Sequence, residues 1–438
     1  MKRLKIALAI LLVILLSGCS ALSFEGTDIM SPPKATGNKA HIQKLIDKQT
    51  TGDYTLKYPK NGSNRSSIVT QDIDSDEDEE AIAFYSDKNG EHIHALFVES
   101  ENGDYRVLSD IILEASSIDR VDFADIDGDK VSEVLIGYSV STSSLNTLNV
   151  YTYSDEIIPL DVSYTYSSLV SGDFNSDKKD DILLISLYSG DVSAQAKLMT
   201  GNLSGSLSEV GTADLDSDVK SLALTQYGQI SYGTYGAVID GISSAGDYTT
   251  QVVFFNPSTP ALLNPLYTYS GYSSTRRTTQ VCSTDFDKDE LIDIPVCSLM
   301  AHAEGEDVNT LSRQISWSNF DTESYLLKTA ERAIICPKDG YVFTMPDKWK
   351  DLVTARYNEK ERTTTVYMYE YSQNTVKLLD KIVTIKAYLD EDFDKDSSGY
   401  TEFLRSGSTV YAYSIGTADN FLSVSGDEIS SHFSLVNQ

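Results

Sequence analysis

Positive charge is scarce in this sequence, since 35 Lys and Arg stand against 65 Asp and Glu, for a formal net charge of −30. Phosphate binding needs clustered Lys and Arg, so this shortage argues against nucleic acid as a partner. Proline occupies only 10 positions, while aliphatic and aromatic residues make up 41% of the chain, a composition that folds. Four cysteines in 438 residues are too few for a disulfide scaffold.

Histidine is scarce as well, at five residues, and the common catalytic signatures are missing. The sequence has no nucleophile elbow, no phosphate-binding Gly-rich loop and no zinc-peptidase His pair. Paired carboxylates are too frequent in so acidic a chain to indicate a glycosidase. His92 and His94 share a face of a predicted strand, but no third ligand can be identified, so exposed blade positions are favoured. The sequence therefore indicates no catalytic residue.

The N-terminus has the pattern of an export signal. Lys2, Arg3 and Lys5 precede an apolar run over residues 6–16, which is too short to span a bilayer as a stable helix. The run ends in Leu-Ser-Gly-Cys19, which resembles the lipobox of bacterial lipoproteins. That resemblance implies cleavage after residue 18 and lipidation of Cys19. The alternative is an ordinary signal peptide in which the cysteine is incidental.

A lipidated Cys19 implies a protein anchored to the membrane of a bacterial cell envelope and facing outside the cytoplasm. Residues 19–39 carry Ser, Gly, Thr and a Pro pair but few large apolar side chains, which is typical of a flexible tether. A short helix is predicted at residues 41–48, where the chain becomes amphipathic. The anchor and tether would thus hold a folded body away from the lipid.

An acidic motif that precedes an apolar run occurs five times. Each copy has Asp at its first position, Asp or Asn at its third, Asp at its fifth and an apolar residue at its second. The copies are Asp72-Ile-Asp74-Ser-Asp76, Asp125-Ile-Asp127-Gly-Asp129, Asp173-Phe-Asn175-Ser-Asp177, Asp214-Leu-Asp216-Ser-Asp218 and Asp285-Phe-Asp287-Lys-Asp289. Intervals of roughly 40 to 70 residues are typical of an array of four-stranded units.

The apolar runs after these motifs are short and rich in β-branched residues, as at 82–85, 134–138 and 182–185, which predicts strands. A closed ring of four-stranded units is a β-propeller. The sequence therefore predicts a mainly β chain, with a propeller of about six or seven blades over residues 40–333. The long interval between the fourth and fifth motifs holds either one blade with an insertion or a second, degenerate blade.

The acidic motifs resemble the loops of FG-GAP/VCBS repeats, the propeller family best known from integrin α-subunits and from many secreted bacterial proteins. The resemblance covers the repeat region only. In that family the side chains at positions one, three, five and nine bind calcium, together with a backbone carbonyl near position seven. The resemblance thus implies calcium as a structural ion.

The residue chemistry agrees with calcium, which takes six to eight oxygen ligands that alternating carboxylates on a tight loop can supply. Four of the five copies carry an oxygen-bearing side chain at all four positions. These candidate ligands are Asp72, Asp74, Asp76 and Glu80; Asp125, Asp127, Asp129 and Glu133; Asp173, Asn175, Asp177 and Asp181; and Asp285, Asp287, Asp289 and Asp293. The fourth copy has Leu222 at the ninth position, so weak binding or none is expected there.

One departure from the usual calcium loop concerns the sixth position, where glycine most easily adopts a positive φ. This chain has other residues there, namely Glu77, Lys130, Lys178, Val219 and Glu290. Strain or a changed loop geometry is one consequence. The alternative interpretation of all five motifs is an acidic turn whose side chains cap the backbone.

Residues 334–438 depart from the repeat and predict a small α+β domain with an antiparallel sheet. Strands are predicted at 341–345, 363–371, 382–388 and 411–415, and helices at 399–406 and 426–435. Ser425 is a predicted helix N-cap, with Glu428 three residues on. The order of these elements weakly resembles the PsbP-like domain.

Cys282 and Cys297 flank the fifth motif on strands that could be neighbours, so a disulfide is one possibility in an exported protein. Free buried thiols are the alternative, and Cys336 is left over in either case.

Two functions follow from these features. The first is a lipid-anchored, calcium-stabilised propeller that binds a protein, peptide or glycan, since propeller loops form a face on which exposed Tyr gives rigid contact area. The second is an envelope-associated enzyme, a polysaccharide hydrolase or lyase, with a pocket on the propeller face or between domains.

Overall fold

The computed structural model describes residues 37–50, 53–90, 92–101, 103–154, 157–160, 162–202, 206–267, 273–372, 375–395, 397–418 and 420–436. The predicted export signal and Cys19 lie outside these residues. The chain divides into two compact units, and the second consists of Ala115–Gln438 with the short segments Pro59–Arg65 and Ile73–Ser75. Within the described residues, no helix has the length and apolarity needed to cross a membrane.

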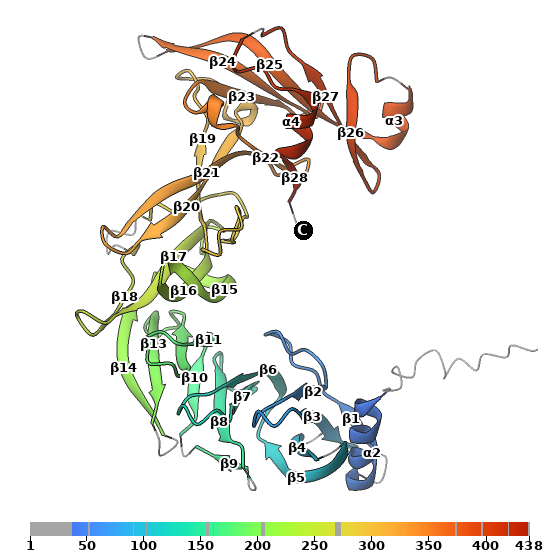
Figure 1. Ribbon diagram of the computed structural model, residues 1–438, viewed down its shortest axis with the longest axis vertical. Coiled ribbons are helices and arrows are strands. Elements are labelled where there is room, and N and C mark those ends of the chain that lie inside the picture. The colour runs from blue at the N-terminus through green and yellow to red at the C-terminus, as the bar shows by residue number, and fades with distance from the viewer. Residues whose placement is uncertain are drawn as a thin grey trace, which may run out of the picture. The chain divides into compact units, whose positions relative to one another are not determined.

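The first unit is one antiparallel sheet with a helix, drawn in blue to cyan in Figure 1. The sheet has the order β1-β3-β4-β5, and β2 pairs with β3. Its elements are α2 (Asn38–Thr50), β1 (Tyr54–Leu56), β2 (Ile68–Gln71), β3 (Glu80–Asp87), β4 (Ile93–Glu101) and β5 (Asp104–Leu113). Ile42 and Ile46 of α2 are fully buried in one cluster with Ile68 and Leu96. The helix predicted at residues 41–48 is confirmed.

The second unit begins with two sheets of the same kind. The second sheet, of order β10-β8-β7-β6 with β9 on β8, contains β6 (Ser117–Ala124), β7 (Glu133–Ser139), β8 (Asn146–Thr152), β9 (Ile158–Pro159) and β10 (Tyr164–Tyr166). The third sheet runs in sequence order through β11 (Ser168–Gly172), β12 (Asp181–Ser186), β13 (Gln195–Gly201) and β14 (Leu207–Asp214). Every residue of β7 except Ser139 is buried, as expected for an apolar run covered on both faces.

The fourth sheet also follows the chain, through β15 (Val219–Ser231), β16 (Thr234–Ser243), β17 (Tyr248–Asn256) and β18 (Ala261–Leu263). The fifth sheet has the order β19-β20-β21-β22-β28, with β19 (Ile294–Leu299), β20 (Arg313–Asp321), β21 (Leu326–Cys336), β22 (Tyr341–Thr344) and β28 (Phe433–Leu435). The long interval between the fourth and fifth acidic motifs therefore holds one sheet and an insertion.

The sixth sheet lies in the C-terminal region, drawn in orange to red in Figure 1, and has the order β23-β24-β25-β27-β26. Its strands are β23 (Val353–Asn358), β24 (Thr363–Ser372), β25 (Thr375–Leu389), β26 (Thr401–Ser406) and β27 (Thr409–Ile415). The helices of this region are α3 (Asp390–Lys395) and α4 (Gly426–Ser431), and two 3-10 turns are η1 (Val308–Thr310) and η2 (Asp347–Trp349). Trp349 of η2 is fully buried in the hydrophobic core of this region, and its Nε1 donates to the Leu422 carbonyl at 2.7 Å.

The predicted fold class is confirmed: the chain is mainly β, built from small antiparallel sheets of propeller-blade type and followed by a small α+β part. In the described residues the repeat region forms five sheets, fewer than the six or seven blades that the sequence predicts, because the long interval after the fourth motif holds only one sheet. The sixth sheet is the predicted C-terminal one. The predicted domain boundary at residue 334 falls inside β21. The strand predicted at 341–345 is β22, which pairs with β21 and completes the fifth sheet together with β28.

One helix prediction in this region is wrong. The other, over residues 426–435, is confirmed for Gly426–Ser431 only, because Phe433–Leu435 pair with β22 as β28. Residues 401–406 form β26, because the Gly407 turn, with φ 56°, folds this segment back onto β27. At α4 the predicted cap is present: Ser425 Oγ accepts from the Glu428 amide, and the Glu428 carboxylate accepts from the Ser425 amide.

Candidate metal centre

Four of the five acidic motifs occupy equivalent places in the sheets. Three connect the first hairpin of a sheet, between β2 and β3, β6 and β7, and β11 and β12. The fifth motif precedes β19, and a bridge from Thr284 to Asp293 closes it in the same way. The fourth motif joins β14 to β15 and thus connects two different sheets. It is not a structural repeat of the other four.

The four equivalent loops share one backbone conformation. Their sixth residues have positive φ although none is glycine, with 78° at Glu77, 76° at Lys130, 71° at Lys178 and 71° at Glu290. Their fourth residues, Ser75, Gly128, Ser176 and Lys288, also have positive φ. Non-glycine residues seldom adopt this conformation, so the surrounding interactions must enforce it. In the fourth motif, Val219 lies instead in the extended strand β15.

Backbone hydrogen bonds to the first carboxylate hold each turn. The sixth-position amide donates to the first Asp in all four loops: Glu77 to Asp72 at 3.3 Å, Lys130 to Asp125 at 3.2 Å, Lys178 to Asp173 at 2.9 Å and Glu290 to Asp285 at 3.1 Å. The seventh-position amide donates to the fifth carboxylate, on Asp76, Asp129, Asp177 and Asp289. This is the capping that the sequence left open as an alternative. The first carboxylate of each loop accepts a second backbone amide as well, and with about four lone-pair sites it keeps further acceptor capacity.

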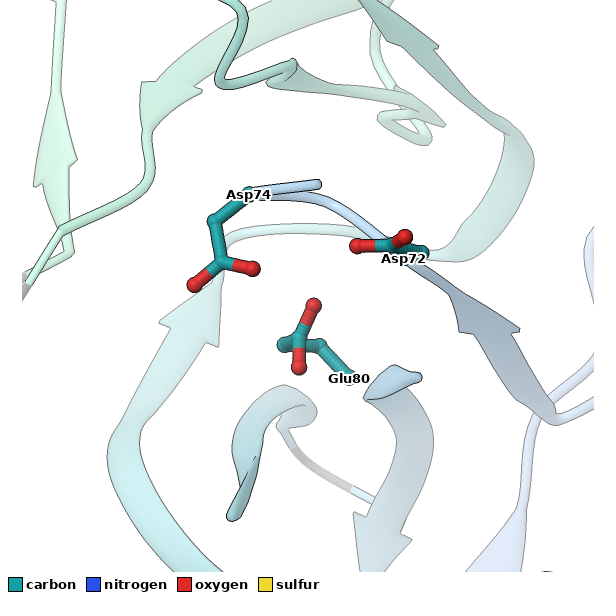
Figure 2. Close-up of side chains that lie close together, drawn as sticks. All are labelled: Asp72, Asp74 and Glu80. Carbon is teal, nitrogen blue, oxygen red and sulfur yellow. The ribbon is translucent and has the colours of Figure 1, made fainter. Parts of the chain in front are cut away.

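Three of the loops bring carboxylates together. In each of three groups, one oxygen per residue lies within 4.8 Å of the others; the groups are Asp72, Asp74 and Glu80, Asp125, Asp127 and Glu133, and Asp285, Asp287 and Asp289. Figure 2 shows the first group, with three carboxyl groups turned toward a common centre. Such convergence of carboxylate oxygens is the donor set that a hard divalent cation prefers.

The third loop is arranged differently, because Asn175 replaces the third-position carboxylate. Its amide Nδ2 lies 3.4 Å from Asp181 Oδ1, so the amide acts as a donor where the other loops have an acceptor. Asn175 Oδ1 accepts from the Asp177 amide at 2.9 Å. This loop therefore offers one negative charge fewer than the second loop.

The ninth-position carboxylate is buried in all four loops, with exposed fractions of 1% for Glu80, 3% for Glu133, 0% for Asp181 and 0% for Asp293. In three of them it accepts from the second-position amide: Ile126 to Glu133, Phe174 to Asp181 and Phe286 to Asp293. Burial raises the pKa of Glu133 to about 7, reinforced by the charges of Asp127 and Asp129. Burial likewise raises the pKa of Asp181 and of Asp293 to about 6. A nearby cation would oppose these shifts.

The second-position residues point into the core as the sequence predicts. Ile73, Ile126, Phe174 and Leu215 are buried. Phe286 is half-buried and stacks on Trp317, with ring centroids 4.7 Å apart. The alternation thus separates the apolar anchor from the oxygen donors on each loop.

In the fourth motif, the side chain of Arg276 supplies the positive charge that a metal ion would supply in the other loops. Arg276 Nη2 lies 2.7 Å from Asp218 Oδ2, and its Nε lies 3.2 Å from Asp247 Oδ2. Hydrogen bonds from Ser244 and Arg276 lower the pKa of Asp218. Asp216 uses its Oδ1 to cap the Asp218 amide at 2.9 Å. The role of Arg276 could not be predicted from the sequence, because this residue lies far along the chain from Asp218. Leu222 at the ninth position is the one sequence signal that this motif differs from the others.

The cysteines and His94, the other candidate residues from the sequence, lie in surroundings that indicate no binding or catalytic role. Cys282, Cys297 and Cys336 are free thiols, so the disulfide between Cys282 and Cys297 is not formed. Burial raises the pKa of Cys282 to about 11 and of Cys336 to about 12, which keeps these thiols protonated and unreactive. His94 Nδ1 lies 3.0 Å from Asp110 Oδ1 and its ring stacks on Tyr85.

No known family description matches the chain, and no curated protein matches it either. Solved structures match at low similarity. A protein from Lactobacillus plantarum has 12% identity and a TM-score of 0.32, with 73% of this chain and 85% of that chain covered. A Bacillus licheniformis rhamnogalacturonan lyase has 11% identity and a TM-score of 0.31, with 85% of each chain covered. The Dos1 propeller has 10% identity and a TM-score of 0.26, with 79% of this chain and 88% of that chain covered.

Proposed function

We propose that the four equivalent acidic loops are calcium sites of the FG-GAP/VCBS type and that the chain is a binding protein of the bacterial cell envelope. The ion has a structural role, because each loop ties the first hairpin of its sheet and carries no catalytic group. The observation that carries the proposal is the shared geometry: four loops far apart in the sequence adopt the same unfavourable backbone and bury the same ninth carboxylate.

The electrostatics of the loops support a cation. A buried carboxylate such as Glu133, with two or three others close by, is costly unless an opposite charge or a proton compensates it. Lys130 and Lys178 are exposed and contribute their backbone amides to the turns. Calcium would supply the missing positive charge at each centre.

The experiment is a thermal melt of the purified chain in EDTA, followed by a calcium titration with magnesium as the control. A ligand that binds only the folded state raises the melting temperature with its concentration. Third-position variants test the site: Asp127→Asn and Asp287→Asn should each weaken the calcium response. The matched variant Asp216→Asn, in the fourth motif, should leave it unchanged. No calcium response in the wild-type chain would contradict the proposal.

The envelope location rests on the sequence of residues 1–19, where the apolar run ends at Cys19. Two acyl chains on that cysteine would anchor the protein stably. Replacement Cys19→Ala should release the protein from the membrane or leave it unprocessed. Retention in the membrane with normal processing would count against lipid anchoring.

A further inference from the structure

A pocket of about 620 Å³ lies within the second unit, beside the turn that joins β21 to β22. Its walls come from residues 278–281, from η1 and the start of β20, from that turn, and from Tyr357 of β23 and Thr364 of β24. None of the acidic loops lines it. A volume in this range accommodates a small organic molecule.

Arg313 lines this pocket without a partner of its own. Its half-buried guanidinium makes no ion pair and no side-chain hydrogen bond with any described residue, whereas the other described arginines all do. Eight of these pair with a carboxylate: Arg106, Arg120, Arg276, Arg277, Arg332, Arg356, Arg362 and Arg405. Arg65 donates to the Gly62 carbonyl. In a chain with a net charge of −30, an arginine that lines a pocket without an ion pair indicates an acidic ligand.

The rest of the described lining mixes apolar residues with uncharged polar ones, apart from one lysine. No Asp or Glu is among the described residues that line the pocket. Lys338 contributes a second positive charge at the rim, where it pairs with the exposed Glu359 at 2.8 Å. An exposed pair of this kind is weak and competes little with a ligand. The described lining therefore carries two basic side chains and no acidic one, although Asp339 accepts from the lining residue Tyr357 just behind it.

Hydroxyl and amide groups supply the other contacts. Thr278 and Gln280 are exposed at the pocket, and Ser312 lies beside Arg313 in the sequence. Ser312 is 5% exposed, and its Oγ is buried, so it is not open to a ligand. The exposed side chains of Thr278 and Gln280 can donate to or accept from ligand hydroxyls.

We propose that this pocket binds a hexuronic acid, either as a free sugar or as the end of an acidic oligosaccharide. Arg313 takes the carboxylate in a two-pronged hydrogen bond, and the Thr278 and Gln280 side chains take the sugar hydroxyls. A free amino acid fits less well, because its ammonium group would find no carboxylate in the lining. The proposal rests on the binding role proposed above and is independent of the calcium sites.

The test is isothermal titration calorimetry of the purified full chain with D-galacturonate. D-galactose serves as the matched sugar without a carboxylate, and N-acetylglycine as a carboxylate without ring hydroxyls. Galacturonate should bind at least about tenfold more tightly than either, because it alone uses both sets of contacts. Equal binding of galactose, equal binding of N-acetylglycine or no binding of galacturonate would each overturn the proposal.

Variants of Arg313 locate the site. Arg313→Gln should weaken galacturonate binding by about tenfold or more, and Arg313→Lys should lose less because it keeps the charge. Arg332→Gln, on the neighbouring strand β21, is the matched control and should bind as the wild type does. Unchanged binding by Arg313→Gln would place any galacturonate site elsewhere and overturn the assignment.

Calcium melts of the same samples separate this proposal from the previous one. A calcium response without galacturonate binding would overturn only the acidic-sugar pocket. Galacturonate binding without a calcium response would overturn only the cation sites. Circular dichroism melts of the Arg313 variants show that a loss of binding is not a loss of fold; because Arg313 has no described partner, we expect these melts to match the wild type.

Discussion

The guanidinium of Arg276 lies 2.7 Å from the Asp218 carboxylate, and it provides the fourth acidic motif with a positive charge that belongs to the protein itself. Both side chains are about one third exposed, so the pair contributes modestly to stability. The fourth motif thus has acidic residues in its first five positions, as the other four motifs do, but Arg276 of the protein itself balances the negative charge of Asp218.

Replacement Arg276→Gln should lower the free energy of unfolding by roughly 0.5–1 kcal/mol. Added calcium should not restore the loss, because Leu222 provides no ninth ligand. Urea unfolding with and without calcium measures both quantities. Calcium rescue of the variant would show that the fourth motif can bind the ion after all.

Calcium-free protein should lose stability as the pH rises from 5 to 8. Glu133, with a pKa of about 7, and Asp181 and Asp293, with pKa values of about 6, hold protons in the folded state that the unfolded chain releases. Their contribution is therefore complete below the unfolded pKa and is lost as the pH passes the folded pKa. Melting temperatures in EDTA across this range give the answer, and Glu133→Gln should flatten the decline. A rise in stability with pH would contradict the raised pKa values.

Glycine at the sixth loop position should stabilise the fold. Lys178 has φ 71°, a conformation that costs a non-glycine residue about 1 kcal/mol, so Lys178→Gly should raise the unfolding free energy by up to that amount. The matched change Val219→Gly, at the sixth position of the fourth motif, should destabilise, because Val219 is fully buried in β15. Urea denaturation in EDTA compares the two. If both substitutions changed the unfolding free energy in the same direction, the backbone at Lys178 would not differ from that at Val219 as described.

A second arginine, next to Arg276 in the sequence, forms a fully buried ion pair. Arg277 Nη2 lies 2.8 Å from Asp240 Oδ1, and both side chains are 0% exposed. Arg277→Met should cost about 3–5 kcal/mol, because it leaves the Asp240 charge uncompensated. The double variant with Asp240→Leu should recover part of the loss. Chemical denaturation measures both, and a double variant less stable than Arg277→Met would refute this explanation.

The sequence predicts the local features that short-range chemistry determines. The alternating donors, the buried second residue and the following strand all belong to one stretch of chain, as at Asp125 to Glu133. The Ser425 cap is equally local, since its partner Glu428 is three residues away. These are the features that the structure reproduces residue by residue.

Other features depend on partners that spacing cannot reveal. The fourth motif looked like a repeat because its first five residues match, whereas its role depends on Arg276 and on the strands that it joins. Residues 401–406 have helical spacing, yet pairing with β27 makes them a strand. Pairing of β22 with β28 moves the end of the fifth sheet past the predicted domain boundary. In each case a long-range contact outweighs the local pattern.

The position of β28 in the fifth sheet has a consequence for the order in which the protein is made. Strands β19 to β22 leave the ribosome well before β28, which holds the edge beside β22. Until residues 433–435 are synthesised, that edge has unpaired backbone groups that another chain could occupy. A premature stop codon between β22 and β28 would leave the edge permanently open. Truncated products should therefore be removed by proteolysis or aggregate, even when most of the C-terminal sheet is intact.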